Sequence, residues 1–225
     1  MTILGIEASG QRTGVAVVSD RLLAETSEPG LNHNEVIIGA IDRCLNQAGV
    51  GLDRLTGIGA TIGPGMFTSL RVGLSVAKGL AIARDIPLKG VNTLLALARS
   101  VPCVPLVLSV IDARKQQVYA CLYENGKPVT AQQAVTPEEL AAGLAPRVKG
   151  QPLILAGSGS ELSASALTAA GIEFELSGLA YPHARVIAEL AAELLEAEGP
   201  DDVAKLVPLY LRKTDAELAR ERNRS

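Results

Sequence analysis

Aromatic residues are scarce in this sequence, whose 225 residues include two Phe, four Tyr and no Trp. Proteins that bind unpaired bases normally stack them on aromatic side chains, so the composition argues against such a surface. The formal net charge is −3, and it predicts no general attraction for phosphate backbones. The basic run from Arg220 to Arg224 is the exception, and two interpretations stay open for it: a solvated tail or a contact with nucleic acid.

The sequence also has few cysteines and no long apolar run. The three cysteines Cys44, Cys103 and Cys121 are widely spaced, with neither a CxxC motif nor a zinc-binding spacing. This usage is typical of a reduced, cytoplasmic protein. No apolar run reaches 18 residues, and the N-terminus has no basic-then-apolar leader, so we expect neither a membrane span nor a signal peptide.

Short β-rich runs alternate with amphipathic stretches, which predicts an α/β protein. In the first half we expect strands at 2–7, 14–19, 22–28, 57–62 and 87–91, and helices at 33–48, 67–83 and 92–100. This β-β-β-α-β-α-β-α order is the repeat unit of the actin-like ATPase (ASKHA) fold, a ribonuclease-H-like layer. After the prolines of 101–105 the pattern partly restarts, with strands at 106–111, 116–123, 128–135 and 153–156 and helices at 137–144, 160–170 and 182–198.

The predicted fold is therefore α/β with two ASKHA lobes, each a mixed sheet flanked by helices. Residues 1–100 form the N-terminal lobe, which carries the helices expected to bind a partner. Residues 101–225 form the C-terminal lobe, whose last helix or tail is the part able to pack back on the first lobe.

The segment from Gly63 to Ala83 is the most informative stretch. A Gly-Pro-Gly turn opens directly into a helix, whose unpaired amides can attract an anion or a partner's polar groups. The helix carries small residues one turn apart in two rows, Ser69/Gly73/Ala77 and Ser75/Gly79/Ala83. Glycine inside a helix costs about 1 kcal/mol relative to alanine, so packing against the chain's own sheet or against another subunit must require it.

Six segments spread over nearly the whole chain together resemble the TsaB (YeaZ) family. They are Ile6–Ser9, His33–Glu35, Gly63–Ala83, Val91–Leu94, Asp112–Arg114 and Pro208–Arg212. The resemblance implies a non-catalytic paralogue of TsaD, which dimerises with its TsaD-like catalytic subunit through the helices at 33–48 and 67–83. That subunit would transfer threonylcarbamoyl to adenosine 37 of ANN-reading tRNAs, and a TsaE-like ATPase would complete the assembly.

The histidines separate this chain from the catalytic paralogue. TsaD-like proteins bind a metal through a His-x-x-x-His pair, which places both imidazoles on one face of a helix. Here Pro29 and Ile37 stand four residues before and after His33, and the other histidine is His183, far along the chain. We therefore predict no metal site and no catalytic residue.

The resemblance also implies which residues contact other molecules. The expected partner interface, which should form a homodimer when the chain is alone, comprises His33, Glu35, Ile38, Phe67, Ser69, Leu70, Arg71, Gly73, Leu74, Ala77 and Lys78. We expect tRNA to be reached only through the complex.

Nucleotide chemistry and hydrolysis are the alternatives. No GxxxxGK[ST] loop is present, so no intrinsic cofactor is expected, and ATP or ADP would sit at a joint site with partners. For a stand-alone ASKHA ATPase or kinase, the residues to hold Mg²⁺ and phosphate would be Glu7, Ser9 and Thr13. An inactive peptidase-like homologue is a further alternative, because Ser158 has neither a nearby histidine nor a GxSxG elbow.

Overall fold

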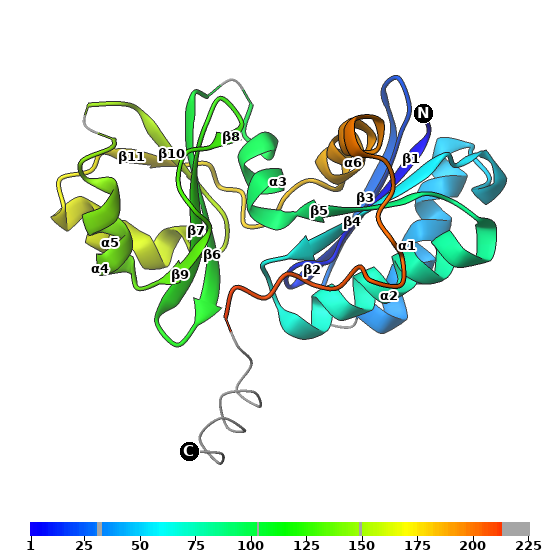
Figure 1. The fold of residues 1–225 in the computed structure, drawn as a ribbon, viewed down its shortest axis with the longest axis horizontal. Coiled ribbons are helices and arrows are strands. Elements are labelled where there is room, and N and C mark those ends of the chain that lie inside the picture. Colours follow the sequence, from blue (N-terminus) through cyan, green and yellow to red (C-terminus); the bar gives the residue numbers. More distant parts are fainter. Residues whose placement is uncertain (31–32, 103, 149, 213–225) are drawn as a thin grey trace, which may run out of the picture.

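The computed structural model describes residues 1–30, 33–102, 104–148 and 150–212 (Figure 1). The first lobe is a five-stranded sheet in the order β3-β2-β1-β4-β5 with three helices. Its elements are β1 (Ile3–Glu7), β2 (Arg12–Val18), β3 (Leu22–Pro29), α1 (His33–Ala48), β4 (Gly57–Gly63), α2 (Phe67–Arg84), β5 (Leu88–Asn92) and α3 (Thr93–Ser100). Strand β1 pairs antiparallel with β2 and parallel with β4, so the sheet is mixed.

The second lobe repeats this order. Its elements are β6 (Leu106–Arg114), β7 (Gln117–Glu124), β8 (Lys127–Pro128), β9 (Gln133–Val135), α4 (Pro137–Leu144), β10 (Leu153–Ala156), α5 (Ser160–Ala169), β11 (Phe174–Leu176) and α6 (Ala184–Glu198). The sheet runs β11-β10-β6-β7-β8, and β9 also pairs with β7. Each lobe thus places its first strand between an antiparallel hairpin partner and a parallel strand, which confirms the two-lobed actin-like fold with mixed sheets.

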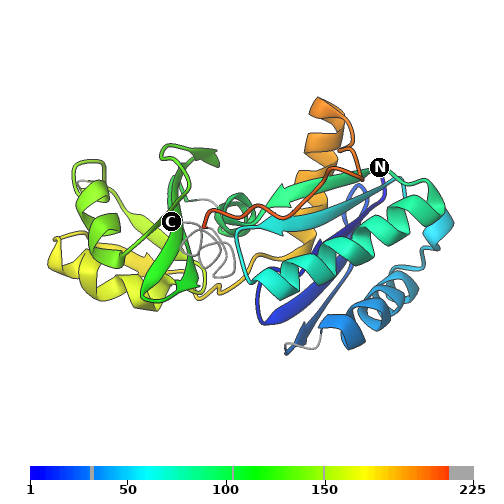
Figure 2. The same ribbon diagram turned by 60° about the horizontal axis from the view of Figure 1, so that its bottom comes forward.

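The first sheet is covered on both faces. Helices α1 and α2 lie side by side on one face and α6 covers the other (Figures 1 and 2). Apolar side chains fill both layers; Leu4, Ile6 and Ile58 belong to the core under α1 and α2, and Ile3 and Ile187 to the core under α6. The central strands are buried on both sides, as their unbroken apolar runs predict.

The last helix of each lobe crosses to the other lobe. Helix α3 follows β5 yet packs on β6 and β7, where Leu94 and Leu97 join Val107 and Tyr123 in one apolar cluster. Helix α6 follows β11 yet packs on β1, β2 and β4. This exchange couples the two sheets, because neither lobe covers its own sheet completely.

The C-terminal segment, residues 199–212, runs along the first lobe and ends at the second (Figure 1). Asp201 extends the sheet edge: its amide donates to the carbonyl of Leu88, and its carboxylate accepts from the amide of Gly90 at 2.8 Å. Farther along, the amide of Leu209 donates to the carbonyl of Ile62. The guanidinium of Arg212 then reaches Gln117 of β7 at 3.2 Å. Helix α6 and this segment therefore lie with the first lobe, although the sequence places them after the second.

Several boundaries differ from the sequence prediction: β6 extends to Arg114 rather than 111, and β2 begins at Arg12 rather than 14. The run 128–135 forms two short strands, β8 and β9, and β11 was not predicted at all. The last helix begins at Ala184 rather than 182, because the carbonyl of Pro182 accepts a hydrogen bond from Arg12 and His183 takes the N-cap position. No described helix is both long enough and apolar enough to cross a membrane. The basic run from Arg220 to Arg224 lies outside the described residues.

Candidate functional site: helix α2 and the cleft between the lobes

Helix α2 begins at the Gly-Pro-Gly turn, and this turn packs tightly on the loop that follows β1. The amide of Met66, the N-cap residue of α2, donates to the carbonyl of Ser9 at 2.8 Å. A Cβ at Gly65 would overlap the same carbonyl oxygen, so a glycine is required there for the close approach. The start of α2 is therefore held by the chain itself.

The row Ser69/Gly73/Ala77 faces inward. All three residues are buried in this chain, together with Leu70 and Leu74. A Cβ on Gly73 would lie 2.6 Å from the Cβ of Ala8, so this glycine allows α2 to approach the chain's own sheet. The expectation that these five residues contact a partner is therefore wrong, because the side chains that surround them leave no surface to share.

The second row of small residues faces solvent instead. Ser75, Gly79 and Ala83 are exposed, and Ile82 on the same side of α2 has an exposed fraction of 72%. The neighbouring helix α1 adds Ile38, which is 56% exposed. We predicted Ile38 as an interface residue, and its exposure is compatible with that prediction. We call these five residues the outer face of α1 and α2.

The remaining interface candidates on α2 contact the C-terminal segment. The guanidinium of Arg71 lies 3.8 Å from the ring centroid of Phe67, and its Nε donates to the Tyr210 hydroxyl at 3.0 Å. The rings of Phe67 and Tyr210 stack at 5.2 Å. Lys78 donates to the carbonyl of Leu206 at 2.7 Å. Arg71 and Lys78 thus fasten this segment to α2, and Phe67 keeps an exposed edge.

His33 and Glu35 stand in the first turn of α1. Their side chains lie outside what the structure describes, so both remain predictions.

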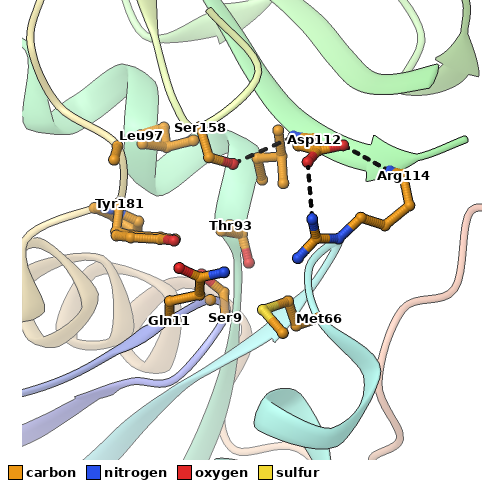
Figure 3. Close-up of a pocket in the computed structure, with 13 residues that line it drawn as sticks. Ser9, Gln11, Met66, Thr93, Leu97, Asp112, Arg114, Ser158 and Tyr181 are labelled. Carbon is orange, nitrogen blue, oxygen red and sulfur yellow. Dashed lines mark hydrogen bonds and ion pairs between the residues drawn. The ribbon is translucent and has the colours of Figure 1, made fainter. Parts of the chain in front are cut away.

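A polar cavity of about 220 Å³ lies between the lobes (Figure 3). The first lobe contributes Ser9 from the β1–β2 turn and Thr93 from the start of α3. The second contributes Asp112 and Arg114 from the end of β6, and Ser158 from the turn after β10. The side chains of these residues point toward a common space in Figure 3.

Hydrogen bonds hold the second-lobe wall of this cavity. The Asp112 carboxylate accepts from the Arg114 amide at 2.7 Å and pairs with the Arg114 guanidinium at 3.4 Å. The Ser158 hydroxyl accepts from the Asp112 amide at 3.2 Å. No described histidine lines the cavity, so Ser158 has no base beside it.

Of the candidate Mg²⁺ and phosphate residues, the structure brings only Ser9 to the cavity. Glu7 is completely buried, and its Oε1 accepts from both the amide and the hydroxyl of Ser9. Burial raises the pKa of Glu7 above its ordinary value of 4.5, and this favours the neutral acid, which is a poor Mg²⁺ ligand. Thr13 is buried within β2. Among the described residues, no group of three or more His, Cys, Asp or Glu side chains is arranged to hold a metal ion.

The cavity does not fit a nucleotide. Its volume lies below the roughly 300–1,000 Å³ of ordinary ligand pockets. The ring of Tyr181 packs directly on Gly10 of the β1–β2 turn, where even a Cβ would overlap it. Tyr181 therefore fills space beside the β1–β2 turn.

The sequence alone predicts no role for Thr93, Asp112, Arg114 or Tyr181. Thr93 and the Asp112–Arg114 turn were noted only as segments that carry the resemblance. A usable signal was present for Thr93, Asp112 and Arg114, because they stand where strands β5 and β6 end, and ligands of open α/β sheets gather at strand ends.

Comparisons with known proteins agree with this fold. The family model described as "TsaD: tRNA N6-adenosine threonylcarbamoyltransferase" matches residues 27–220. The tRNA threonylcarbamoyladenosine biosynthesis protein TsaB of Bacillus subtilis is 32% identical to this chain and covers 96% of both proteins. A tRNA N6-adenosine threonylcarbamoyltransferase of Syntrophus aciditrophicus is 36% identical, but the match covers 53% of this chain and 42% of that protein.

The solved structure of YeaZ from Pseudomonas aeruginosa superposes with a TM-score of 0.80 and 26% identity, over 93% of this chain and 99% of that one. The match to TsaB extends over both lobes, whereas the match to the transferase spans less than half of that protein. The chain therefore belongs to the TsaB (YeaZ) branch of the tRNA N6-adenosine threonylcarbamoyltransferase family.

Proposed function

We propose that this chain is a non-catalytic accessory subunit for the threonylcarbamoyl modification of tRNA. It acts by docking a TsaD-like catalytic subunit on the outer face of α1 and α2. The name of the Bacillus subtilis relative supports the pathway, and the catalytic relatives supply the kind of partner. The absence of a catalytic role rests on the complete burial of Glu7, which raises the pKa of its carboxyl group, and on the small cavity.

The observation that carries the docking proposal is the exposed row on α2. Ser75, Gly79 and Ala83 have small side chains on the exposed side of this helix. Because the distance between packed helices depends on the side chains at their contact, a partner helix can approach closely here. Ile82 belongs to the same side of α2 and Ile38 to the neighbouring helix α1, and both have more than half of their surface in solvent. A partner helix that lies along the row buries both isoleucines, which stabilises the complex by the hydrophobic effect.

The rest of the assembly follows from this surface. Without its partner, the chain pairs with a second copy through the same face in a two-fold symmetric dimer. A TsaE-like ATPase completes the complex, and ATP or ADP is bound at a surface shared with the partners. This chain meets tRNA only through the complex.

The test is Gly79→Leu, measured by co-purification with the TsaD-like subunit. A Cβ at Gly79 meets no atom within 4 Å, so the variant should fold normally. The added side chain keeps a partner helix away, and we expect binding to weaken by about 5-fold to 150-fold, from overpacking worth about 1–3 kcal/mol. Modification of tRNA by the reconstituted complex should fall with it.

The matched control is Gly143→Leu in α4 of the second lobe. Gly143 is also exposed, helical and free of atoms within 4 Å. It should leave co-purification, tRNA modification and the homodimer seen in sedimentation unchanged. Normal partner binding by Gly79→Leu would overturn the proposed docking face.

A further inference from the structure

Thr93 carries a buried hydroxyl that has no partner. The residue is completely buried and lines the cavity between the lobes, and its Oγ1 has no hydrogen-bond partner among the described residues. Figure 3 shows the hydroxyl directed into the cavity. A buried polar group left unpaired costs about 1–3 kcal/mol, and such groups usually have a partner in the functional state. The hydroxyl therefore points to a ligand atom in the cavity.

Several other polar groups on the cavity wall can donate a hydrogen bond. The Ser158 hydroxyl accepts from the backbone, so its own hydrogen remains available to a ligand. Gln11 and Tyr181 bring an amide and a phenol. The guanidinium of Arg114 is largely exposed and has five N–H donors, of which its neighbour uses few.

The carboxylate acceptors near the cavity are engaged, and the Ser9 hydroxyl, which donates its hydrogen to Glu7, presents its oxygen as an acceptor. One oxygen of Asp112 accepts from the Arg114 amide, and the other pairs with the Arg114 guanidinium. Behind the β1–β2 turn, burial raises the pKa of Glu7, which lowers the share of its negatively charged form. Arg12 lies nearby with its guanidinium over the Tyr181 ring. Several donors on the wall with positive charge close by favour an anion.

We propose that this cavity binds a single small oxyanion, the phosphate or carboxylate group of a molecule too small to be a nucleotide. Thr93 and Ser158 donate their hydroxyl hydrogens to it, and Arg114 supplies the charge. Because Thr93 starts α3 and the other two residues belong to the second lobe, the ion links elements that meet across the cleft. None of the five residues of the outer face of α1 and α2 lines this cavity.

Inorganic phosphate and acetate separate the two possible sources of the oxyanion. Each is titrated into the full chain by calorimetry, with chloride used to hold the ionic strength constant. Saturable binding of phosphate alone identifies a phosphate site, and saturable binding of acetate alone identifies a carboxylate site. ADP serves as the size control and should bind more weakly than the preferred ion.

Thr93→Val tests the residue that carries the inference, because valine keeps the shape and removes the hydroxyl. We expect affinity for the preferred ion to fall about tenfold or more, as for the loss of a hydrogen bond to a charged group. Without ligand the variant should be as stable as the wild type or more so. Ser109→Ala is the control, since Ser109 has another buried and unpaired hydroxyl but does not line the cavity. It should leave ion binding unchanged.

Three results would overturn the proposal. They are no saturable binding of either ion in the millimolar range, wild-type affinity in Thr93→Val, and tighter binding of ADP than of both ions. Loss of partner binding in Gly79→Leu bears on none of these, so the two proposals fail separately.

Discussion

The two glycines of α2 should respond to alanine with opposite changes in stability. Gly79 is exposed and a Cβ there meets no atom, so Gly79→Ala gains the helix propensity of alanine, up to about 1 kcal/mol. At Gly73 the same gain in helix propensity is opposed by a steric clash, because the new Cβ would lie 2.6 Å from the Cβ of the buried Ala8. Overpacking of this kind costs about 1–3 kcal/mol. Gly73→Ala should therefore be neutral or less stable by up to about 2 kcal/mol.

The measurement is urea unfolding followed by far-ultraviolet circular dichroism, with the two variants and the wild type side by side. The free energies of unfolding of the two variants should differ by about 1–3 kcal/mol at an unchanged m-value. For a chain of this length each kcal/mol moves the melting temperature by about 2–4 °C, so a thermal scan resolves the difference. Equal stabilisation by both substitutions would refute the argument that the inner row, and not the outer one, packs on the sheet.

Two further predictions concern buried charges. Burial raises the pKa of Glu7 above its ordinary value of 4.5, so the folded chain binds this proton more tightly than the unfolded chain, and stability falls as pH rises above about 4.5. Glu7→Gln does not titrate, so it should gain stability relative to the wild type as pH rises through this region in urea unfolding. A difference that stays constant with pH would contradict this. Lys89, 6% exposed, pairs with Asp201 at 3.0 Å and Glu198 at 2.8 Å. Lys89→Met should lower the free energy of unfolding by about 1–3 kcal/mol. This is less than the ~3–5 kcal/mol expected for a fully buried pair, because both carboxylates reach solvent. The substitution should also speed proteolysis of residues 199–212. Lys205→Met, which removes an exposed ion pair, should change neither measurement.

Most elements of the fold could be read from the sequence because their patterns are strong. The unbroken apolar run at 57–62 and the Gly-Pro-Gly turn place β4 and α2 within one residue of the observed ends. Strand β11 was missed because Phe174–Leu176 is only three residues long, and its side chains are half-buried or exposed. A strand this short, stabilised by its pairing with β10, has too few residues to show a period.

The orientation of α2 was the main error. The rows Ser69/Gly73/Ala77 and Ser75/Gly79/Ala83 have the same residue types at the same spacing, so small size alone cannot say which row faces inward. The neighbours decide it. Leu70 and Leu74 flank the inner row and are buried, whereas Arg71 on the other side reaches the C-terminal segment. A count of apolar and charged neighbours around each row would have predicted the correct face.

The cavity illustrates a different limit. The fold predicts that strand ends meet between the lobes, but it does not predict the size of the cavity there. Tyr181 narrows the cleft from a segment that precedes α6, a helix that crosses from one lobe to the other. The unpaired state of Thr93 depends in the same way on the packing of α3 against the second sheet. Contacts between residues this far apart in the chain leave no periodic signal in either segment.

The proposed docking face and the proposed oxyanion site share helix α2. Met66 lines the cavity, and its amide donates a hydrogen bond to the carbonyl of Ser9 on the cavity wall. The exposed row begins about two and a half turns farther along the same helix, at Ser75. A partner that shifts α2 along its axis would therefore move Met66 against Ser9 and change the cavity. Binding free energies are reciprocal, so an oxyanion would then change partner affinity by the same factor as the partner changes oxyanion affinity. If α2 stays fixed on its sheet, as the close contact at Gly73 favours, that factor is one and the two sites act independently.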